Sequence, residues 1–285
     1  MQPCLPPRKE TRKPKLKAPK LACDCHSHIF GPESKYPYTP NRSFTPPDAL
    51  VPEYLKLAKT LGLERTVVVQ ASVFGSDNRC TAAAVMDMGL ERARGIAMVD
   101  ANVSKEALRA LDASGIRGTR FITTVKGGPT LDNLPGVAKK VAELGWHIEM
   151  YIPRHLWRET LPVLKTLPVS VVFDHMGGLM ADTADNDPDL KGIMALLESG
   201  KHWVKLCGYR ASKTGHPYAD VAPLGRRFVS RVPDRCVWGT DWPHTTLADY
   251  MPDDGDLMDL LLDWAPDEKA RQKILVDNPA RLYRF

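Results

Sequence analysis

The sequence predicts a single (β/α)8 barrel, an α/β fold of the TIM-barrel class. Eight short runs rich in apolar and β-branched residues recur along the chain, as expected for buried parallel strands. Amphipathic stretches typical of helices separate these runs. The region from residue 21 to residue 285 also matches the roughly 250 residues of a typical barrel. A doubly wound open sheet is the main alternative, but no glycine fingerprint follows the first run.

Each expected element follows from a local pattern. The runs expected to form strands are 21–30, 65–70, 93–100, 117–123, 147–152, 169–175, 202–208 and 235–241. The stretches expected to form helices between them include 47–63, 104–115, 135–145 and 188–200. In the first of these helices, Pro47 suits the first turn and Gly62 suits the end.

The composition indicates an ordinary globular protein, with 43% hydrophobic and 26% charged residues. No apolar run approaches the roughly 20 residues that span a bilayer, and the N-terminus lacks the apolar region of a signal peptide. The six cysteines are too sparse for a disulfide framework. We therefore expect free thiols, a reducing compartment and a cytoplasmic location, without membrane partners.

The positive charge is concentrated in the first 20 residues. This segment carries seven Lys or Arg, one Glu and five Pro, a balance of +6 against +5 for the whole chain. Residues 1–20 are therefore expected to form a flexible, loosely attached basic arm, and residues 21–285 a single barrel domain that is nearly neutral. Nucleic acid is not an expected partner, and the expected assembly is a monomer or a small homo-oligomer.

The stretch "CDCHSHIFGP" places Asp24, His26 and His28 at alternate positions of the first expected strand. Because alternate side chains of a strand point to opposite faces, these three are expected to face the barrel axis. Their neighbours, the side chains of Cys23, Cys25 and Ser27, would then face the helices. The polar set would emerge at the carboxyl end of the strand, where barrel enzymes build their active sites.

Further polar residues follow the carboxyl ends of the other expected strands. They are Arg120, Tyr151, His175, Lys205, Tyr209, Arg210, Asp241 and His244. Any one of them could be an ordinary residue at a loop edge. Their common position at one rim of the barrel favours a shared site.

At these residues the chain resembles a known family. The segments "DCHSH", "FDHMGG" and "WGTDWPH" are similar to motifs of the amidohydrolase superfamily, in particular its branch of 2-pyrone-4,6-dicarboxylate lactonases and related lactone hydrolases. The resemblance extends over residues 21–285. It implies a barrel enzyme that hydrolyses a small cyclic ester in the catabolism of aromatic acids.

The resemblance also implies roles for single residues. The catalytic set would be His26, His28, His175 and Asp241. Substrate contacts would come from Ser72, Arg120, Lys126, Tyr151 and Arg210, and the rim position of His244 adds it to this group. Two positions depart from the pattern of the dicarboxylate lactonases, with Lys126 in place of an arginine and Phe44 in place of a tyrosine. The acid recognised is therefore either pyrone dicarboxylate or a related lactone such as a sulfonated or carboxylated muconolactone.

The expected cofactor requirement is none. A binuclear metal site in this superfamily needs a bridging Lys or Glu and a further His, where this chain has Arg120 and Tyr151. A guanidinium cannot ligate a metal. If one divalent ion binds, zinc is the expected metal and His26, His28 and Asp241 its ligands.

The mechanism that follows is hydrolytic ring opening. Asp241 would act as general base toward a water molecule, with its pKa raised toward the working range by burial. His26, His28 and His175 would donate hydrogen bonds to the lactone carbonyl oxygen. Two alternatives remain: a lactone isomerase or decarboxylase on the same fold, and a binding protein for small acids without catalytic activity.

Overall fold

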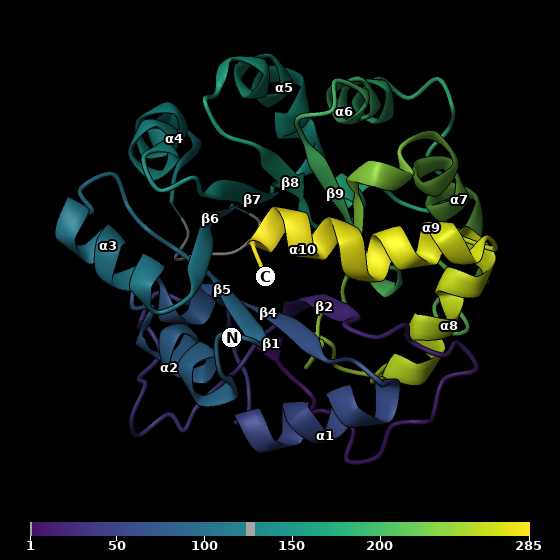
Figure 1. Cartoon of the computed structure of the whole chain (residues 1–285), viewed down its shortest axis with the longest axis horizontal. Coiled ribbons are helices and arrows are strands. Elements are labelled where there is room, and N and C mark those ends of the chain that lie inside the picture. The colour runs from purple at the N-terminus through teal and green to yellow at the C-terminus, as the bar shows by residue number, and fades with distance from the viewer. Residues whose placement is uncertain (1, 124–128) are drawn as a thin grey trace.

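The computed structural model describes residues 2–123 and 129–285. Eight parallel strands lie side by side in the order β2-β4-β5-β6-β7-β8-β9-β10. The ring closes between the first and the last strand, where Ser27 pairs with Trp242 and the amide of Asp241 donates to His26 O at 2.8 Å. Figure 1 shows the helices arranged around this ring. The predicted (β/α)8 barrel is confirmed.

The barrel strands are short, as the eight predicted runs required. They are β2 Cys23–Ser27, β4 Arg65–Val69, β5 Ala93–Ala97, β6 Ile116–Ile122, β7 His147–Tyr151, β8 Val171–Phe173, β9 Trp203–Leu206 and β10 Cys236–Trp238. Two further segments, β1 Gln2–Pro3 and β3 Phe44–Thr45, form a separate parallel pair. Each predicted run therefore coincides with a barrel strand, and only β6 begins before its run, by one residue.

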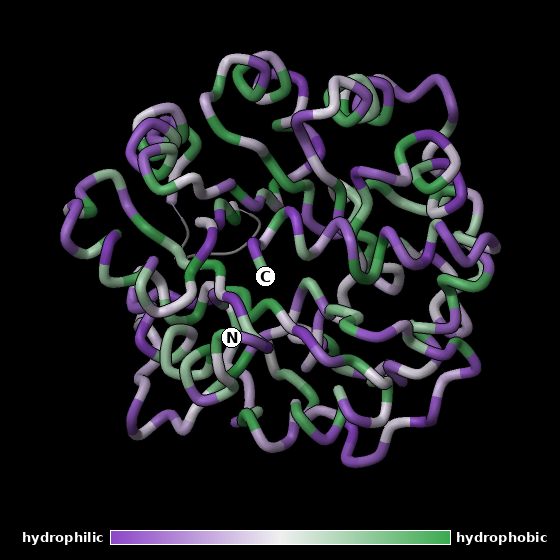
Figure 2. Tube along the Cα trace, in the orientation of Figure 1, coloured by the Kyte–Doolittle hydropathy of each residue, from purple (hydrophilic) through white to green (hydrophobic). Residues whose placement is uncertain are grey.

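The helices surround the barrel, except for α10, which lies across one of its ends (Figure 1). They are α1 Val51–Leu61, α2 Arg79–Met88, α3 Lys105–Ala113, α4 Leu134–Ala142, α5 Trp157–Thr166, α6 Pro188–Glu198, α7 Ala222–Arg231, α8 Asp254–Trp264, α9 Glu268–Gln272 and α10 Asn278–Tyr283. Hydrophobic and hydrophilic residues alternate along most of them (Figure 2), because one face packs inward. The short α9 has no buried residue. Within the described ranges, the structure contains no helix with the length and apolar character that a membrane crossing requires.

The first helix begins later than predicted. Ala49 exchanges backbone hydrogen bonds with Phe30 at 2.8 and 2.9 Å, so the chain is still extended where the sequence predicted helix. Helix α1 starts at Val51, and Pro52 rather than Pro47 occupies its first turn. The predicted end is correct, because Gly62 terminates the helix in a left-handed conformation with φ of 77°.

Strand β2 contains an irregularity that changes which side chains face the barrel interior. The register with β4 shifts between Asp24 and Ser27, so one extra residue interrupts the simple alternation. Cys23 and Cys25 pack in the interior cluster with Tyr283. Asp24 instead accepts hydrogen bonds from Tyr54 of α1 and from Thr240. The prediction that Asp24 faces the axis, and the two cysteines the helices, is therefore wrong.

The amino-terminal end of the barrel is closed by α10. Figure 1 shows this helix crossing the middle of the ring. The side chain of Tyr283 is fully buried, and its hydroxyl donates to Glu149 Oε1 at 3.0 Å. The cavity described below lies at the opposite, carboxyl end of the barrel.

The N-terminal segment differs from the expectation of a loosely attached arm. The Arg12 guanidinium lies 2.6 Å from Asp259 and 2.7 Å from Asp256 on α8, and its amide donates to Asp253. Leu16 is only 3% exposed, and its amide donates to Asp259 Oδ1 at 2.9 Å. The physical reason is charge complementarity, because the basic segment meets an acidic face of α8.

Replacing Leu16 with Ala is expected to destabilise the protein by about 2 kcal/mol, the lower end for truncation of a buried leucine. Leu21, which is 37% exposed, provides the matched control. Its replacement by Ala should change the free energy of unfolding by under about 0.5 kcal/mol. Urea unfolding of both variants measures the difference. Equal effects at the two positions would show that the segment around Leu16 is not packed in solution.

Candidate active site

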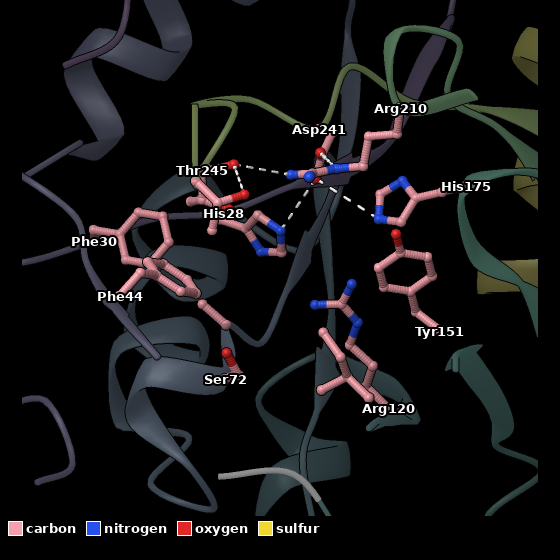
Figure 3. A pocket seen from close by; sticks show the side chains of 13 residues that line it. His28, Phe30, Phe44, Ser72, Arg120, Tyr151, His175, Arg210, Asp241 and Thr245 are labelled. Carbon is pink, nitrogen blue, oxygen red and sulfur yellow. Dashed lines mark hydrogen bonds and ion pairs between the residues drawn. The ribbon is translucent and has the colours of Figure 1, made fainter. Parts of the chain in front are cut away.

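A cavity of about 230 Å³ opens at the carboxyl ends of the barrel strands. The wall combines two cationic side chains, two imidazoles and one carboxylate with several apolar groups (Figure 3). The lining residues are His28, Phe30, Phe44, Ala71, Ser72, Arg120, Ile122, Tyr151, His175, Arg210, Asp241, Thr245 and Thr246. A mainly preformed pocket with a few converging polar groups is typical of a small-molecule site.

The two oxygens of Asp241 have different surroundings. Oδ2 accepts hydrogen bonds from the Tyr209 hydroxyl and from Arg210 Nε. Oδ1 is buried and has no hydrogen-bond partner among the described residues. Three imidazole nitrogens surround it, with Nε2 of His28 at 3.4 Å, of His26 at 3.5 Å and of His175 at 4.0 Å. One oxygen thus anchors the carboxylate and leaves the other available for chemistry.

The pKa of Asp241 is shifted in the direction opposite to the prediction. Burial alone would raise its pKa, as the sequence suggested, but the charge of Arg210, which is bound to Oδ2, acts against burial and holds the pKa well below the usual range of an aspartate. The carboxylate is therefore ionised at neutral pH, and the prediction of a raised pKa is wrong.

The two imidazoles on the cavity wall are held in different ways. His28 Nδ1 lies 2.7 Å from Val69 O; a carbonyl oxygen only accepts, so Nδ1 carries a proton and neutral His28 has a lone pair at Nε2. His175 follows β8 in a left-handed turn with φ of 49°, and Gly177 continues that turn with φ of 69°. This turn explains the glycines of "FDHMGG". His175 Nδ1 has no hydrogen-bond partner among the described residues.

A buried ionic network lies below this cavity. Lys205 Nζ is 2.7 Å from Glu149 Oε2, 3.0 Å from Asp174 Oδ1 and 3.0 Å from His26 Nδ1. Arg120 Nε donates to Asp174 Oδ2 at 3.1 Å. Burial alone would lower the pKa of Lys205, but Asp174 and Glu149 raise it above its ordinary value. Burial, Lys205 and Arg120 hold the pKa of His26 well below its ordinary value, so this imidazole is neutral.

Sequence reasoning missed Glu149 and Asp174, and it placed Lys205 only at the rim. The sequence did contain an indication of this ionic network. Charged residues are rarely fully buried unless they are paired, and all three stand within or next to predicted strands. Two carboxylates and an ammonium inside a barrel therefore indicated mutual neutralisation.

The two arginines give the cavity its positive charge. Arg120 is 3% exposed, and its Nη1 donates to Gln70 O at 3.3 Å. Arg210 binds Asp241, and its Nη2 donates to Thr245 O at 3.3 Å. Because guanidinium groups bind carboxylates and related anions well, this cavity suits a small acid.

Some of the other residues predicted to contact the substrate line the cavity, and others do not. Ser72 and Tyr151 line the cavity, and so does Phe44. Lys126 lies outside the described residues. His244 does not line the cavity: it is 1% exposed, and its Nε2 lies 3.0 Å from Asp254 Oδ1. Its predicted contact with substrate is not supported, because Asp254 at the start of α8 draws the imidazole away.

The hydrogen bonds of the predicted metal ligands bear on whether they can hold a cation. Donor atoms of His26, His28 and Asp241 gather within 4.8 Å of one another, which is close enough for one cation. His28 suits a metal, because its Nδ1 proton is bound by a carbonyl and its Nε2 lone pair is free. His26 does not, since Lys205 occupies the nitrogen that would have to carry the proton of a ligating imidazole. The three residues therefore do not fit a metal in this arrangement.

The fold and the site together define a class of enzymes. A closed barrel with ionisable groups converging at the carboxyl ends of its strands is the arrangement of (β/α)8 enzymes. A family model described as amidohydrolase matches residues 23–285. The chain belongs to this amidohydrolase family.

Within this family, the chain is similar to proteins of known sequence or structure over nearly its whole length. A 2-pyrone-4,6-dicarboxylate hydrolase from Comamonas testosteroni is 39% identical and covers 95% of this chain and 92% of its own. A 4-sulfomuconolactone hydrolase from Hydrogenophaga intermedia is 37% identical and covers 98% and 94%. A solved apo structure from Agrobacterium tumefaciens superimposes with a TM-score of 0.88 at 33% identity, covering 95% and 96%.

Proposed function

We propose that this protein hydrolyses a small anionic lactone, with 2-pyrone-4,6-dicarboxylate and 4-sulfomuconolactone as the two leading substrates. The similarity to hydrolases of these two compounds supports the reaction class. The single observation in the site that carries the proposal is the unpaired oxygen Oδ1 of an ionised Asp241, a residue of the cavity wall, beside imidazoles and guanidinium groups. A role in the breakdown of aromatic acids in the cytoplasm follows as part of the same proposal.

In the proposed mechanism, Asp241 and His28 hold the attacking water. Asp241 Oδ1 and His28 Nε2 are 3.4 Å apart, and both present lone pairs. A water molecule has two hydrogens to donate, so these two acceptors orient its oxygen toward the substrate. As the C–O bond forms, Asp241 takes one proton, and that proton then passes to the ring oxygen as the ester bond breaks.

The carbonyl oxygen needs donors that face the cavity. His175 and Tyr151 supply them, because both line the cavity and their rings meet edge to face with centroids 4.8 Å apart. Burial raises the pKa of Tyr151, so its phenol keeps its proton. His28 presents a lone pair rather than a proton, and His26 is fully buried outside the cavity wall. The predicted group of three donating histidines thus becomes one histidine and one tyrosine.

The acidic groups of the substrate are assigned to the cations. Arg120 and Arg210 stand on either side of the carbonyl donors in the cavity wall (Figure 3), and Lys126 remains a candidate third cation. An apolar wall of Phe30, Phe44 and Ile122 takes the unsubstituted edge of the ring. We propose that no metal is required, because the carbonyl donors and the base are all side chains of this barrel.

The test is a panel of carboxylated and sulfonated lactones, with the products identified by NMR. Ring-opened acid from either leading substrate is the expected product, with a rate unchanged by a metal chelator. Migration of the carbonyl would instead identify an isomerase, and loss of CO2 a decarboxylase. A protein that binds the lactones without turnover would be a small-acid binding protein.

Replacing Arg210 with Met is expected to move the acidic limb of the kcat/KM profile to higher pH. Arg210 holds the pKa of Asp241 down, and activity requires the ionised carboxylate; without Arg210 the carboxylate protonates at a higher pH, so activity is lost sooner on acidification. Arg120→Met is the control, because Arg120 pairs with Asp174 instead. It should weaken substrate binding without moving the limb. A limb at the same pH in the wild type and in the Arg210 variant would contradict this assignment.

A further inference from the structure

The buried lysine of β9 has a contact that the proposed reaction does not use. Lys205 is 0% exposed, and its ammonium lies 2.7 Å from Glu149, 3.0 Å from Asp174 and 3.0 Å from His26 Nδ1. An ammonium has three N–H donors and no lone pair. Each of its three neighbours must therefore be an acceptor. Two of these acceptors are carboxylate oxygens, and the third is the imidazole nitrogen Nδ1 of His26.

This contact determines where the proton of His26 lies. A neutral imidazole carries one N–H, so if Nδ1 accepts from Lys205, the proton is on Nε2. The opposite tautomer would donate from Nδ1 to Asp174 Oδ1 at 3.5 Å and accept at Nε2 from Arg120 at 3.5 Å. Both distances are at the outer limit of a hydrogen bond. That tautomer would also direct an N–H at the ammonium 3.0 Å away. The Lys205 contact therefore favours the tautomer with the proton on Nε2.

We propose that Lys205 is a positioning residue that holds His26 as its Nε2–H tautomer. The proton on Nε2 then points toward Asp241 Oδ1, 3.5 Å away. His28 approaches the same oxygen at 3.4 Å with a lone pair, because its own proton is bound to Val69 O. His26 in β2 and His28 just after it thus have opposite tautomers. At 3.5 Å the N–H of His26 makes a favourable electrostatic contact with Asp241 Oδ1 without a hydrogen bond, and His28 adds an acceptor beside it.

The same contact keeps a divalent cation out of the site. A metal on His26 Nε2 needs the lone pair of that nitrogen, so the proton would have to move to Nδ1. Lys205 already directs an N–H at Nδ1. The donor atoms of His26, His28 and Asp241 are near enough to hold a cation, and Lys205 is what prevents it. This inference goes beyond the proposed hydrolysis, because it concerns one imidazole whatever the substrate.

The first experiment is NMR of the wild-type protein labelled with ¹⁵N-histidine, with His26→Asn used to assign the signals. The expected spectrum gives His26 a protonated Nε2 and an unprotonated Nδ1, and gives His28 the reverse. A proton on Nδ1 of His26 would overturn the proposal. Since no variant of Lys205 is needed, this result does not depend on tolerance of the barrel to substitution.

The second experiment removes the ammonium together with one carboxylate. Lys205→Met/Glu149→Gln leaves the charge balance of the network unchanged and frees His26 Nδ1. Titration with zinc chloride by calorimetry should show affinity about 10–100-fold higher than in the wild type, the scale on which partners of metal ligands act. Adding His26→Asn to the double variant should abolish the gain. Equal zinc affinity in wild type and folded double variant would overturn the proposal.

Circular dichroism melting shows whether the double variant is folded, and the NMR result alone decides if it is not. Neither measurement involves turnover. A failure here would therefore leave the proposed lactone hydrolysis standing, and a failure of the lactone panel would leave the His26 tautomer to be decided by NMR.

Discussion

Replacing Asp241 with Asn is expected to reduce kcat for lactone hydrolysis by about 10²–10⁴-fold, the contribution of a positioned general base. The amide has nearly the shape of the carboxylate, so contacts with Tyr209 and Arg210 can largely be kept. It cannot take a proton from water at neutral pH. Substrate or product affinity, measured by calorimetry, should change far less than kcat. This combination separates loss of the base from loss of the cavity.

Asp254→Asn provides the matched control. Asp254 is also buried, at 2% exposed, and it lies beside His244 rather than on the cavity wall. Its replacement should alter kcat by no more than a few-fold. An Asp241→Asn variant that stays folded and retains at least a tenth of wild-type kcat would remove Asp241 from the mechanism as its base.

The second large effect is expected at His175. His175→Asn should lower kcat by about 10²–10³-fold, the usual cost of removing one donor to a developing oxyanion. The imidazole lines the cavity, and its Nε2 lies 4.0 Å from Asp241 Oδ1. An N–H at this nitrogen can therefore donate to a substrate oxygen held beside Asp241. Steady-state kinetics on the better substrate of the panel measures the loss.

His244→Asn is the control for this position. Both imidazoles are nearly fully buried, at 3% and 1% exposed, but only His175 reaches the cavity. The His244 variant is expected to remain within a few-fold of wild-type kcat. A loss below threefold at His175, or equal losses at both positions, would contradict the role given to His175.

Much of this architecture follows from local sequence patterns. Eight apolar runs separated by amphipathic stretches are enough to predict the barrel, because a parallel strand that is buried on both faces must be apolar. The position of Asp241 and His175 after the last and the sixth run predicts that they meet, since carboxyl ends of parallel strands share one rim. The structure places Asp241 Oδ1 and His175 Nε2 4.0 Å apart.

Other features depend on contacts between residues far apart in the chain. The bulge in β2 arises from its pairing with β4, and it reverses the expected orientation of Asp24. His244 turns toward Asp254 of α8, a contact that no local pattern indicates. The N-terminal segment meets an acidic helix more than 200 residues away along the chain. In each case the partner, and not the residue itself, decides the outcome.

The fold class, the rim where the site lies and most of the side chains that form it follow from the amino-acid sequence, because these depend on periodicity and on the shared direction of parallel strands. The protonation and hydrogen bonding of those side chains follow from the folded arrangement. The pKa of Asp241 is lowered by the charge of Arg210 despite burial, and the proton of His26 is placed by Lys205. Charge and hydrogen bonding act through distances of a few ångströms, and folding alone sets those distances.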